Sequence, residues 1–321
     1  MKKNYLTGLR SINEMLIEEF NASELHKLIK RDGLLACIRN NAICIYYNSD
    51  RVAKVSLSGD KLKCEVSSYY LSDFHLTRVR QQSETVYVSD EDIVNDIETI
   101  ILNSKMRETP EKKAQQHLIY LNNSNKDSKW FCFDIEYRQS KTKQKDTPVF
   151  DGRFDILAIS KEAPHRVAVI ELKYGDSAIG GKSGIVKHIK DFNNFNNSAS
   201  CKRNLANEIP VILKNLEAIG YDVPSQLTSS PIEISNHIEF YLICLYEGNT
   251  TKGTVGGYLF DEKRPNWPTK RISKSNNAVT ELGIDVESLT CPIDITFLFK
   301  EVNSPTDFDI TDILNTQNYD K

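Results

Sequence analysis

The hydrophobic pattern of the first hundred residues alternates between helical and strand-like spacing. Apolar residues at positions 9, 12, 16 and 17 predict a first helix, and a second is predicted over residues 23–31. Four strand-like runs follow, separated by short stretches of Asn, Ser, Gly and Asp, at residues 34–39, 42–47, 51–57 and 61–68. Such short polar breaks are typical of an antiparallel meander. A helix over residues 90–104 ends this part, so we expect a smaller α+β domain over residues 1–105.

Beyond residue 105 the order of the predicted helices and strands changes. The predicted elements are a helix, three strands, two helices and a strand, at residues 109–120, 130–138, 152–160, 166–174, 185–197, 202–220 and 237–246. A glycine-rich stretch over residues 175–184 precedes the two helices, and residues 254–260 and 293–302 can extend the same sheet. The pattern predicts an α/β domain over residues 106–302, with a mixed central sheet flanked by helices. A polar tail over residues 303–321 completes the chain.

Two neighbouring predicted strands carry charged residues where the pattern calls for apolar ones. In the strand GRFDILAIS, alternation places Asp155 on the same face as core residues. In RVAVIELKYG, Glu171 and Lys173 point to one side. Burying such charges is costly unless they pair with one another or with an ion. Two adjacent carboxylates favour a divalent cation; the alternative is a structural salt bridge, either Glu171 with Lys173 or Asp155 with Arg153.

Asp155, followed by the run IELK at residues 170–173, resembles the motif of the PD-(D/E)xK nuclease superfamily. The resemblance covers residues 109–248 in motif and element order, and it implies the restriction-endonuclease-like fold. The family's aspartate falls on Asp155, its second acidic residue on Glu171 and its lysine on Lys173. The proline that names the motif is Phe154 in this chain. The resemblance implies a hydrolase that cleaves phosphodiester bonds, as many restriction, recombination and repair nucleases do.

The chemistry of these residue types agrees with that expectation. Phosphodiester hydrolysis needs a deprotonated water and a counter-charge for the phosphate oxygens, and Mg²⁺, or Mn²⁺ in its place, meets both needs. The resemblance implies that Asp155, Glu171 and the backbone carbonyl of Leu172 hold the ion. Lys173, beside it, is expected to orient the attacking water and to stabilise the developing charge.

Further candidate residues lie on the two helices that frame the strands. On the helix at 109–120, Glu111 is a candidate ligand for a second metal or for a metal-bound water, and Gln115 lies one turn later on the same face. The helix region after the third strand supplies three candidate contacts to the phosphate backbone of DNA, namely Lys182, Lys187 and His188. The alternative for this helix is a solvated face on which Lys187 pairs with Asp191.

Two more acidic residues lie near the motif. Glu136, on the strand before Asp155, is either an additional ligand or an ordinary charge of an edge strand, and we favour the second interpretation. Asp151 is a rival to Asp155, but it lies in the turn that enters the strand rather than within the strand. We therefore assign the motif aspartate to Asp155.

Composition excludes several classes of protein. Of the 321 residues, 40% are hydrophobic and 26% charged, as in an ordinary globular protein. The formal net charge of -3 argues against coating nucleic acid by bulk attraction but allows a local basic groove. The seven scattered cysteines form no CxxC pair, so neither a disulfide framework nor a zinc cluster is expected. No apolar stretch approaches the ~18 residues of a membrane helix, so we expect a cytoplasmic protein without a membrane partner.

Together these observations predict a magnesium-dependent endonuclease acting on DNA, with RNA as the weaker alternative. The N-terminal domain is expected to recognise the substrate or a protein partner, or to form a homodimer. The competing hypothesis is a catalytically inactive protein that keeps the nuclease fold as a nucleic-acid- or protein-binding module. Asp155, Glu171 and Lys173 favour the enzyme, because an inactive protein has little reason to keep three charged residues that are unfavourable to bury.

Overall fold

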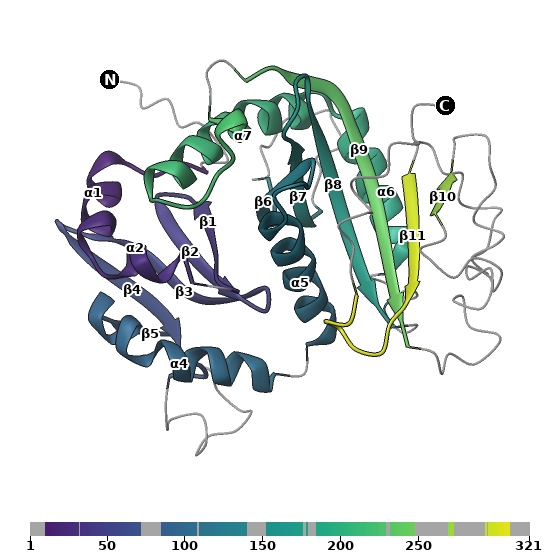
Figure 1. The fold of residues 1–321 in the computed structure, drawn as a ribbon. Helices are drawn as coiled ribbons and strands as arrows, with labels where there is room; N and C mark the ends of the chain where they lie inside the picture. Colours follow the sequence, from purple (N-terminus) through teal and green to yellow (C-terminus); the bar gives the residue numbers. More distant parts are fainter. Residues whose placement is uncertain are drawn as a thin grey trace. The chain divides into compact units, whose positions relative to one another are not determined.

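The computed structural model describes residues 10–31, 33–71, 85–107, 109–139, 152–175, 178, 184–228, 232–247, 269–272, 293 and 295–308. The chain divides into two compact units, each with a sheet of its own (Figure 1). The first comprises Met1–Lys112 and Asn207–Ser230, and the second Lys113–Ala206 and Pro231–Lys321. The expected boundary near residue 105 thus differs from the division after Lys112, and a later segment joins the first unit. Among the described residues, none of the helices combines the length and hydrophobicity of a membrane span.

The first unit is built on a five-stranded antiparallel sheet in the described part of the chain. Each strand pairs with the next, in the order β1 (Leu35–Arg39), β2 (Ala42–Tyr47), β3 (Asp50–Ser58), β4 (Lys61–Ser67) and β5 (Thr85–Val88). Asn48 and Ser49, between β2 and β3, have φ angles of 50° and 52°, the geometry of a tight hairpin turn. The predicted meander is confirmed, and β5 is a strand that the sequence pattern did not predict.

The described part of the first unit includes the helices α1 (Glu14–Ala22), α2 (Leu25–Leu28) and α4 (Asp90–Met106), of which α1 and α4 begin at recognisable capping signals. The Asn13 side chain accepts a hydrogen bond from the Leu16 N–H at the start of α1. Ser89 and Asp92 form a reciprocal capping box at the start of α4. Both α1 and α4 contact β4, and α4 also contacts β3, so their apolar stripes cover the meander.

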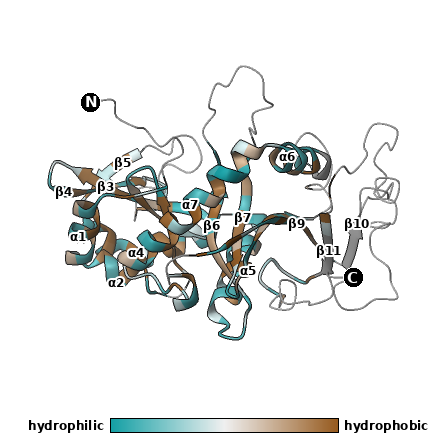
Figure 2. Cartoon of the chain, turned by 90° about the horizontal axis from the view of Figure 1, so that it is seen from above, coloured by the Kyte–Doolittle hydropathy of each residue, from teal (hydrophilic) through white to brown (hydrophobic). Residues whose placement is uncertain are grey.

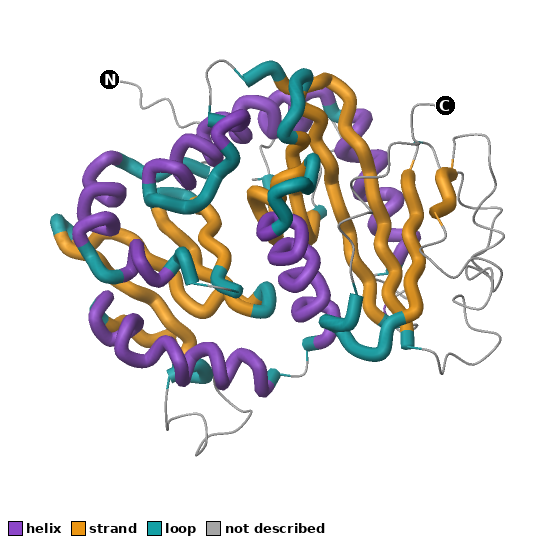
Figure 3. Tube along the Cα trace, viewed as in Figure 1, coloured by secondary structure: helices purple, strands orange, loops and turns teal. Residues whose placement is uncertain are grey.

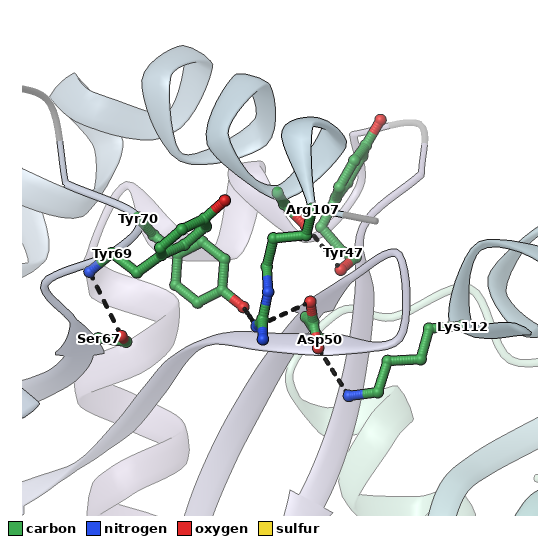
Figure 4. A network of polar contacts seen from close by, with 8 residues as sticks. Tyr47, Asp50, Ser67, Tyr69, Tyr70, Arg107 and Lys112 are labelled. Atoms are coloured by element: carbon green, nitrogen blue, oxygen red, sulfur yellow. Dashed lines mark hydrogen bonds and ion pairs between the residues drawn. The ribbon is translucent and has the colours of Figure 1, made fainter. Parts of the chain in front are cut away.

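A polar cluster connects β3 to the residues that follow α4 (Figure 4). Asp50 is 3% exposed, and its two carboxylate oxygens pair with Arg107 at 3.1 Å and Lys112 at 2.6 Å. Arg107 also donates to the Tyr70 hydroxyl at 2.8 Å. Burial, with the charge of Asp50 nearby, raises the pKa of Tyr70 to about 12. The cluster satisfies a buried carboxylate and ties the linker after α4 to the sheet.

In the residues that the structure describes, the second unit contains a six-stranded mixed sheet with helices around it. Its elements are α5 (Pro110–Ser124), β6 (Trp130–Tyr137), β7 (Phe154–Ser160), β8 (His165–Tyr174), α6 (Ile185–Asn197), α7 (Ala199–Ala218), β9 (Ile234–Tyr246), β10 (Thr269–Ile272) and β11 (Ile295–Glu301). The helices α5 and α7 each cross a division between the units. The predicted order of helix, three strands, two helices and strand is found as expected.

The strands of this sheet run in the order β10-β11-β9-β8-β7-β6 (Figure 3). The first three in sequence form an antiparallel meander, and the chain then crosses over through α6 and α7 so that β9 pairs with β8 in parallel. β11 pairs with β9 in parallel, which confirms the prediction for residues 293–302, and β10 is an additional strand. The strand predicted at residues 254–260 lies outside the described residues.

The central strands of this sheet are buried on both faces. All residues of β7 and all but one of β6 are buried, and the coloured strands of the sheet are largely brown in Figure 2, whereas the helices carry teal outer faces. Helices α5 and α6 lie on opposite faces of the sheet (Figures 1 and 2). Phe154, which is fully buried, lies with its ring centroid 5.7 Å from that of Phe192 and 5.1 Å from that of Phe195 on α6. This aromatic packing fixes α6 against the start of β7.

We predict that Phe154→Ala destabilises the second unit. Removal of a fully buried ring that contacts two other rings of α6 costs about 3–5 kcal/mol of unfolding free energy. Urea denaturation followed by far-UV circular dichroism measures the change. Tyr120→Ala is the matched control, because this α5 ring is 37% exposed and its loss should change stability by less than about 0.5 kcal/mol. Equal unfolding midpoints for the two variants would contradict the packing argument.

Candidate active site

Asp155 and Glu171 lie opposite each other where the β7–β8 ladder ends. The register pairs Ile156 with Ile170, so the next residues outward are Asp155 and Glu171. Their exposed fractions are 6% and 1%. The Asp155 carboxylate accepts a hydrogen bond from the backbone N–H of Leu172, with an Oδ2–N distance of 2.9 Å. The structure therefore brings the two predicted carboxylates together in the interior of the second unit.

The two oxygens of Glu171 have different surroundings. Oε1 lies 2.8 Å from the Lys173 ammonium and 3.0 Å from Nε2 of His188 on α6. Oε2 is equally buried, but no described residue forms a hydrogen bond with it. Lys173 and His188 are themselves only 5% and 8% exposed. One oxygen is thus held by two nitrogen groups, while the other is left without the donor that a buried carboxylate oxygen requires.

The electrostatics of the pair favour a positive ligand. Burial raises the pKa of Glu171 well above its usual range, and the negative charge of Asp155 raises it further. The positive charge of Lys173 acts in the opposite direction but does not outweigh the burial. Without a cation, Glu171 is therefore stabilised in its protonated form. A divalent cation between the carboxylates would take the place of that proton.

The donor set suits a hard cation that keeps several waters. The described residues contain no group of three or more His, Cys, Asp or Glu side chains that could hold a metal ion. Two carboxylates and a backbone carbonyl are nevertheless enough for Mg²⁺, which retains part of its water shell. The Leu172 N–H faces Asp155, and in an extended strand the C=O of the same residue faces the same neighbour. The predicted ligand set of Asp155, Glu171 and the Leu172 carbonyl thus fits the coordination of Mg²⁺.

The other residues predicted for the site differ in burial and in contacts. Lys187 is exposed and pairs with Asp191 at 2.5 Å, as the solvated-face alternative anticipated. Gln115 is buried on α5, with 3% exposure. Glu111 is half-buried in the first turn of α5 and belongs to the first unit, so its role as a ligand stays a prediction. Lys182 lies outside the described residues.

Glu136 and Arg153 form an ion pair that the sequence analysis did not foresee. The distance between Glu136 Oε2 and Arg153 Nη1 is 2.6 Å. β6 is the edge strand of the described sheet, which agrees with the interpretation of Glu136 as an edge-strand charge. Arg153 thus pairs with Glu136, and a structural bridge between Asp155 and Arg153 stays an alternative prediction. Asp151, the rival to Asp155, is outside the described residues.

The contact of His188 with Glu171 was also missed by sequence reasoning, which had placed His188 among the candidate DNA contacts. The available signal was weak: His188 lies in the first turn of the helix that follows the IELK strand. Which way that turn faces depends on how Phe192 and Phe195 pack, and periodicity alone does not define it.

No family model, curated protein or solved structure matches the chain. The resemblance to PD-(D/E)xK nucleases therefore remains one of motif and element order. The geometry of Asp155, Glu171 and Lys173 is what bears on function.

We predict that His188→Ala weakens cation binding without abolishing it. His188 holds Glu171 Oε1, and loss of such a supporting contact typically lowers metal affinity by about 10- to 100-fold. Titration calorimetry with Mn²⁺ measures the affinity, and Asp155→Asn gives the reference for a lost ligand. His188→Gln, whose amide nitrogen can replace Nε2, should recover much of the affinity. Asp191→Asn on the same helix is the control, and an equal loss in that variant would contradict a specific role for His188.

We also predict that cation binding depends on pH. Without a cation, the folded protein binds the Glu171 proton more tightly than the unfolded chain does. Its stabilising contribution is therefore full below the unfolded-state pKa and is lost as pH rises toward the raised folded-state pKa. Because a cation needs the ionised carboxylate, Mn²⁺ affinity should rise with pH through that window and binding should release protons. Calorimetry in two buffers of different ionisation enthalpy tests this; identical heats at a constant affinity would contradict it.

Proposed function

We propose that the second unit is a divalent-cation-dependent nuclease that hydrolyses phosphodiester bonds in DNA. The observation that carries the proposal is the buried pair Asp155 and Glu171, with Lys173 2.8 Å from Glu171 Oε1 and no hydrogen bond from any described residue to Glu171 Oε2. A structural salt bridge between Glu171 and Lys173 needs no second buried carboxylate beside it. Asp155 adds a second buried carboxylate whose charge raises the pKa of Glu171, and a bound cation would offset that charge.

The topology of the second unit supports the same proposal. A helix, three antiparallel strands, a helical crossover and a parallel strand follow one another in α5 to β9. This is the element order that the resemblance to the restriction-endonuclease-like fold implies. The candidate residues lie on the second and third of those strands, where the motif of the family places them. Topology and charge placement were inferred from different features of the sequence, so their agreement strengthens the proposal.

The side chains of the site divide the work of hydrolysis. Asp155, Glu171 and the Leu172 carbonyl would hold Mg²⁺ or Mn²⁺, which when bound supplies positive charge against the phosphate and acidifies a water. Lys173, within 2.8 Å of a ligand oxygen, is placed to orient the attacking water and to offset charge that develops on the phosphate. His188 keeps Glu171 in position. Buried surroundings strengthen each of these electrostatic interactions.

A catalytically inactive binding module is the competing function. The contact between Lys173 and Glu171 favours it in one respect, because a direct ion pair stabilises the two charges without any ligand. DNA rather than RNA as substrate follows the resemblance alone. A role of the first unit in recognising the substrate or a partner also belongs to the proposal.

We predict that the protein nicks plasmid DNA with Mn²⁺ and not with EDTA, and that Lys173→Ala abolishes nicking. Lys173 contacts a ligand but is not one, so the variant should still bind Mn²⁺ in a calorimetric titration. Lys190→Ala is the control, because this lysine is exposed on α6 and should leave cleavage unchanged. Nicking by Lys173→Ala at the wild-type rate would contradict the assigned role. Binding of Mn²⁺ and DNA without any cleavage by the wild-type protein would favour the binding module.

A further inference from the structure

A third acidic residue lies in the same row as the two carboxylates of the site. The β6–β7 register pairs Ile135 with Ile156 and Tyr137 with Phe154, so Glu136 lies opposite Asp155. Asp155 in turn lies opposite Glu171 on β8. One acidic residue from each of three neighbouring strands therefore occupies the same level of the sheet. Unlike the other two, Glu136 is neutralised by an arginine.

Arg153 lies beside these three acidic residues, and its side chain is exposed to solvent. It precedes Asp155 by two residues, and its side chain is 58% exposed, whereas that of Glu136 is 19% exposed. Its Nη1 lies 2.6 Å from Glu136 Oε2, and Glu136 is the partner that the described residues provide. A guanidinium group has five N–H donors in a rigid plane, so this contact leaves several donors for another ligand. Half-exposed ion pairs of this kind stabilise a fold very little, so the contact with Glu136 does not exclude a second role for Arg153.

The backbone conformation of Glu136 is a second sign that the pair of Glu136 and Arg153 has a functional role. Its φ angle is +52°, a left-handed conformation that non-glycine residues rarely adopt and that costs about 1–3 kcal/mol. Such strain persists where the surrounding structure enforces it, and it is found preferentially at functional sites. Here the strained residue is the one that holds Arg153.

We propose that Arg153, held by Glu136, binds a phosphate of the substrate backbone next to the bond that is cleaved. The inference rests on the proposed nuclease function and adds a substrate-binding residue to it. Planar arginines bind phosphate oxygens through two parallel N–H donors, and the exposed guanidinium is the group best suited to do so beside Asp155. It also supplies positive charge where a polyanion must approach two buried carboxylates.

Fluorescence anisotropy with a labelled DNA duplex and Mn²⁺ tests the proposal, in the Lys173→Ala background so that the DNA is not consumed. Arg153→Gln should weaken binding by about 10- to 100-fold and lower the slope of log affinity against log salt by about one. Arg153→Lys should keep the slope and lose part of the affinity. Arg166→Gln is the matched control: Arg166 pairs with Glu239 at 2.9 Å on the same sheet and is 41% exposed. Mn²⁺ affinity, measured by calorimetry, should not fall in any of these variants.

The outcomes separate this inference from the nuclease proposal. DNA affinity and salt slope that are unchanged by Arg153→Gln, or lowered equally by Arg166→Gln, would overturn the role of Arg153 while leaving the nuclease proposal intact. Loss of Mn²⁺ affinity in Arg153→Gln would show a role in the ion site and would also overturn it. A Lys173→Ala protein with no affinity for DNA, together with a wild-type protein that does not nick it, would overturn both.

Discussion

The burial of two like charges at the end of one strand ladder is the constraint on which the second unit depends. An unpaired ion in a protein interior costs several kcal/mol, comparable to the gain from burying a large aromatic side chain. Asp155 and Glu171 are both nearly inaccessible, so their surroundings must offset that cost. A backbone N–H from β8, a lysine from the same strand and a histidine from α6 do so in part. Glu171 Oε2 has no hydrogen-bond partner among the described residues, and the proposed cation would complete the balance there.

Much of this arrangement follows from the alternation of side chains along strands. The runs that became β6, β7 and β8 are too apolar for exposed strands and are separated by short polar breaks, which predicts a buried antiparallel meander. Given that meander, Asp155 and Glu171 share a face only in one set of registers, because a slip by one residue would turn either strand over. The hydrophobic residues around each charge select the observed register. The charge pair and its contact with Lys173 were therefore accessible from sequence, although the contact with His188 was not.

The rest depended on contacts between residues far apart in the chain. The phenyl rings of α6 pack against Phe154, and this packing sets the rotation of α6 about its axis so that His188 contacts Glu171. Hydrophobic periodicity does not specify that rotation. Glu136 pairs with Arg153 through a left-handed backbone conformation that its residue type disfavours. The short strand β10 carries too few residues for a period to be recognised. The second segment of the first unit, Asn207–Ser230, begins inside α7, and the pattern of a single continuous helix does not show that its two ends belong to different units.

Phe154 shows how the packing of the sheet and the chemistry of the site are coupled. The motif of the resembling nucleases has a proline at this position, which would restrict the backbone directly before the aspartate. Phenylalanine has no such restriction, but its ring is fully buried among Tyr137, Phe192 and Phe195. The packing of the phenyl ring can therefore immobilise the start of β7, as the ring of a proline would. The same ring anchors α6, and α6 carries the His188 that holds Glu171, so a single aromatic residue fixes one carboxylate through its own strand and the other through a neighbouring helix.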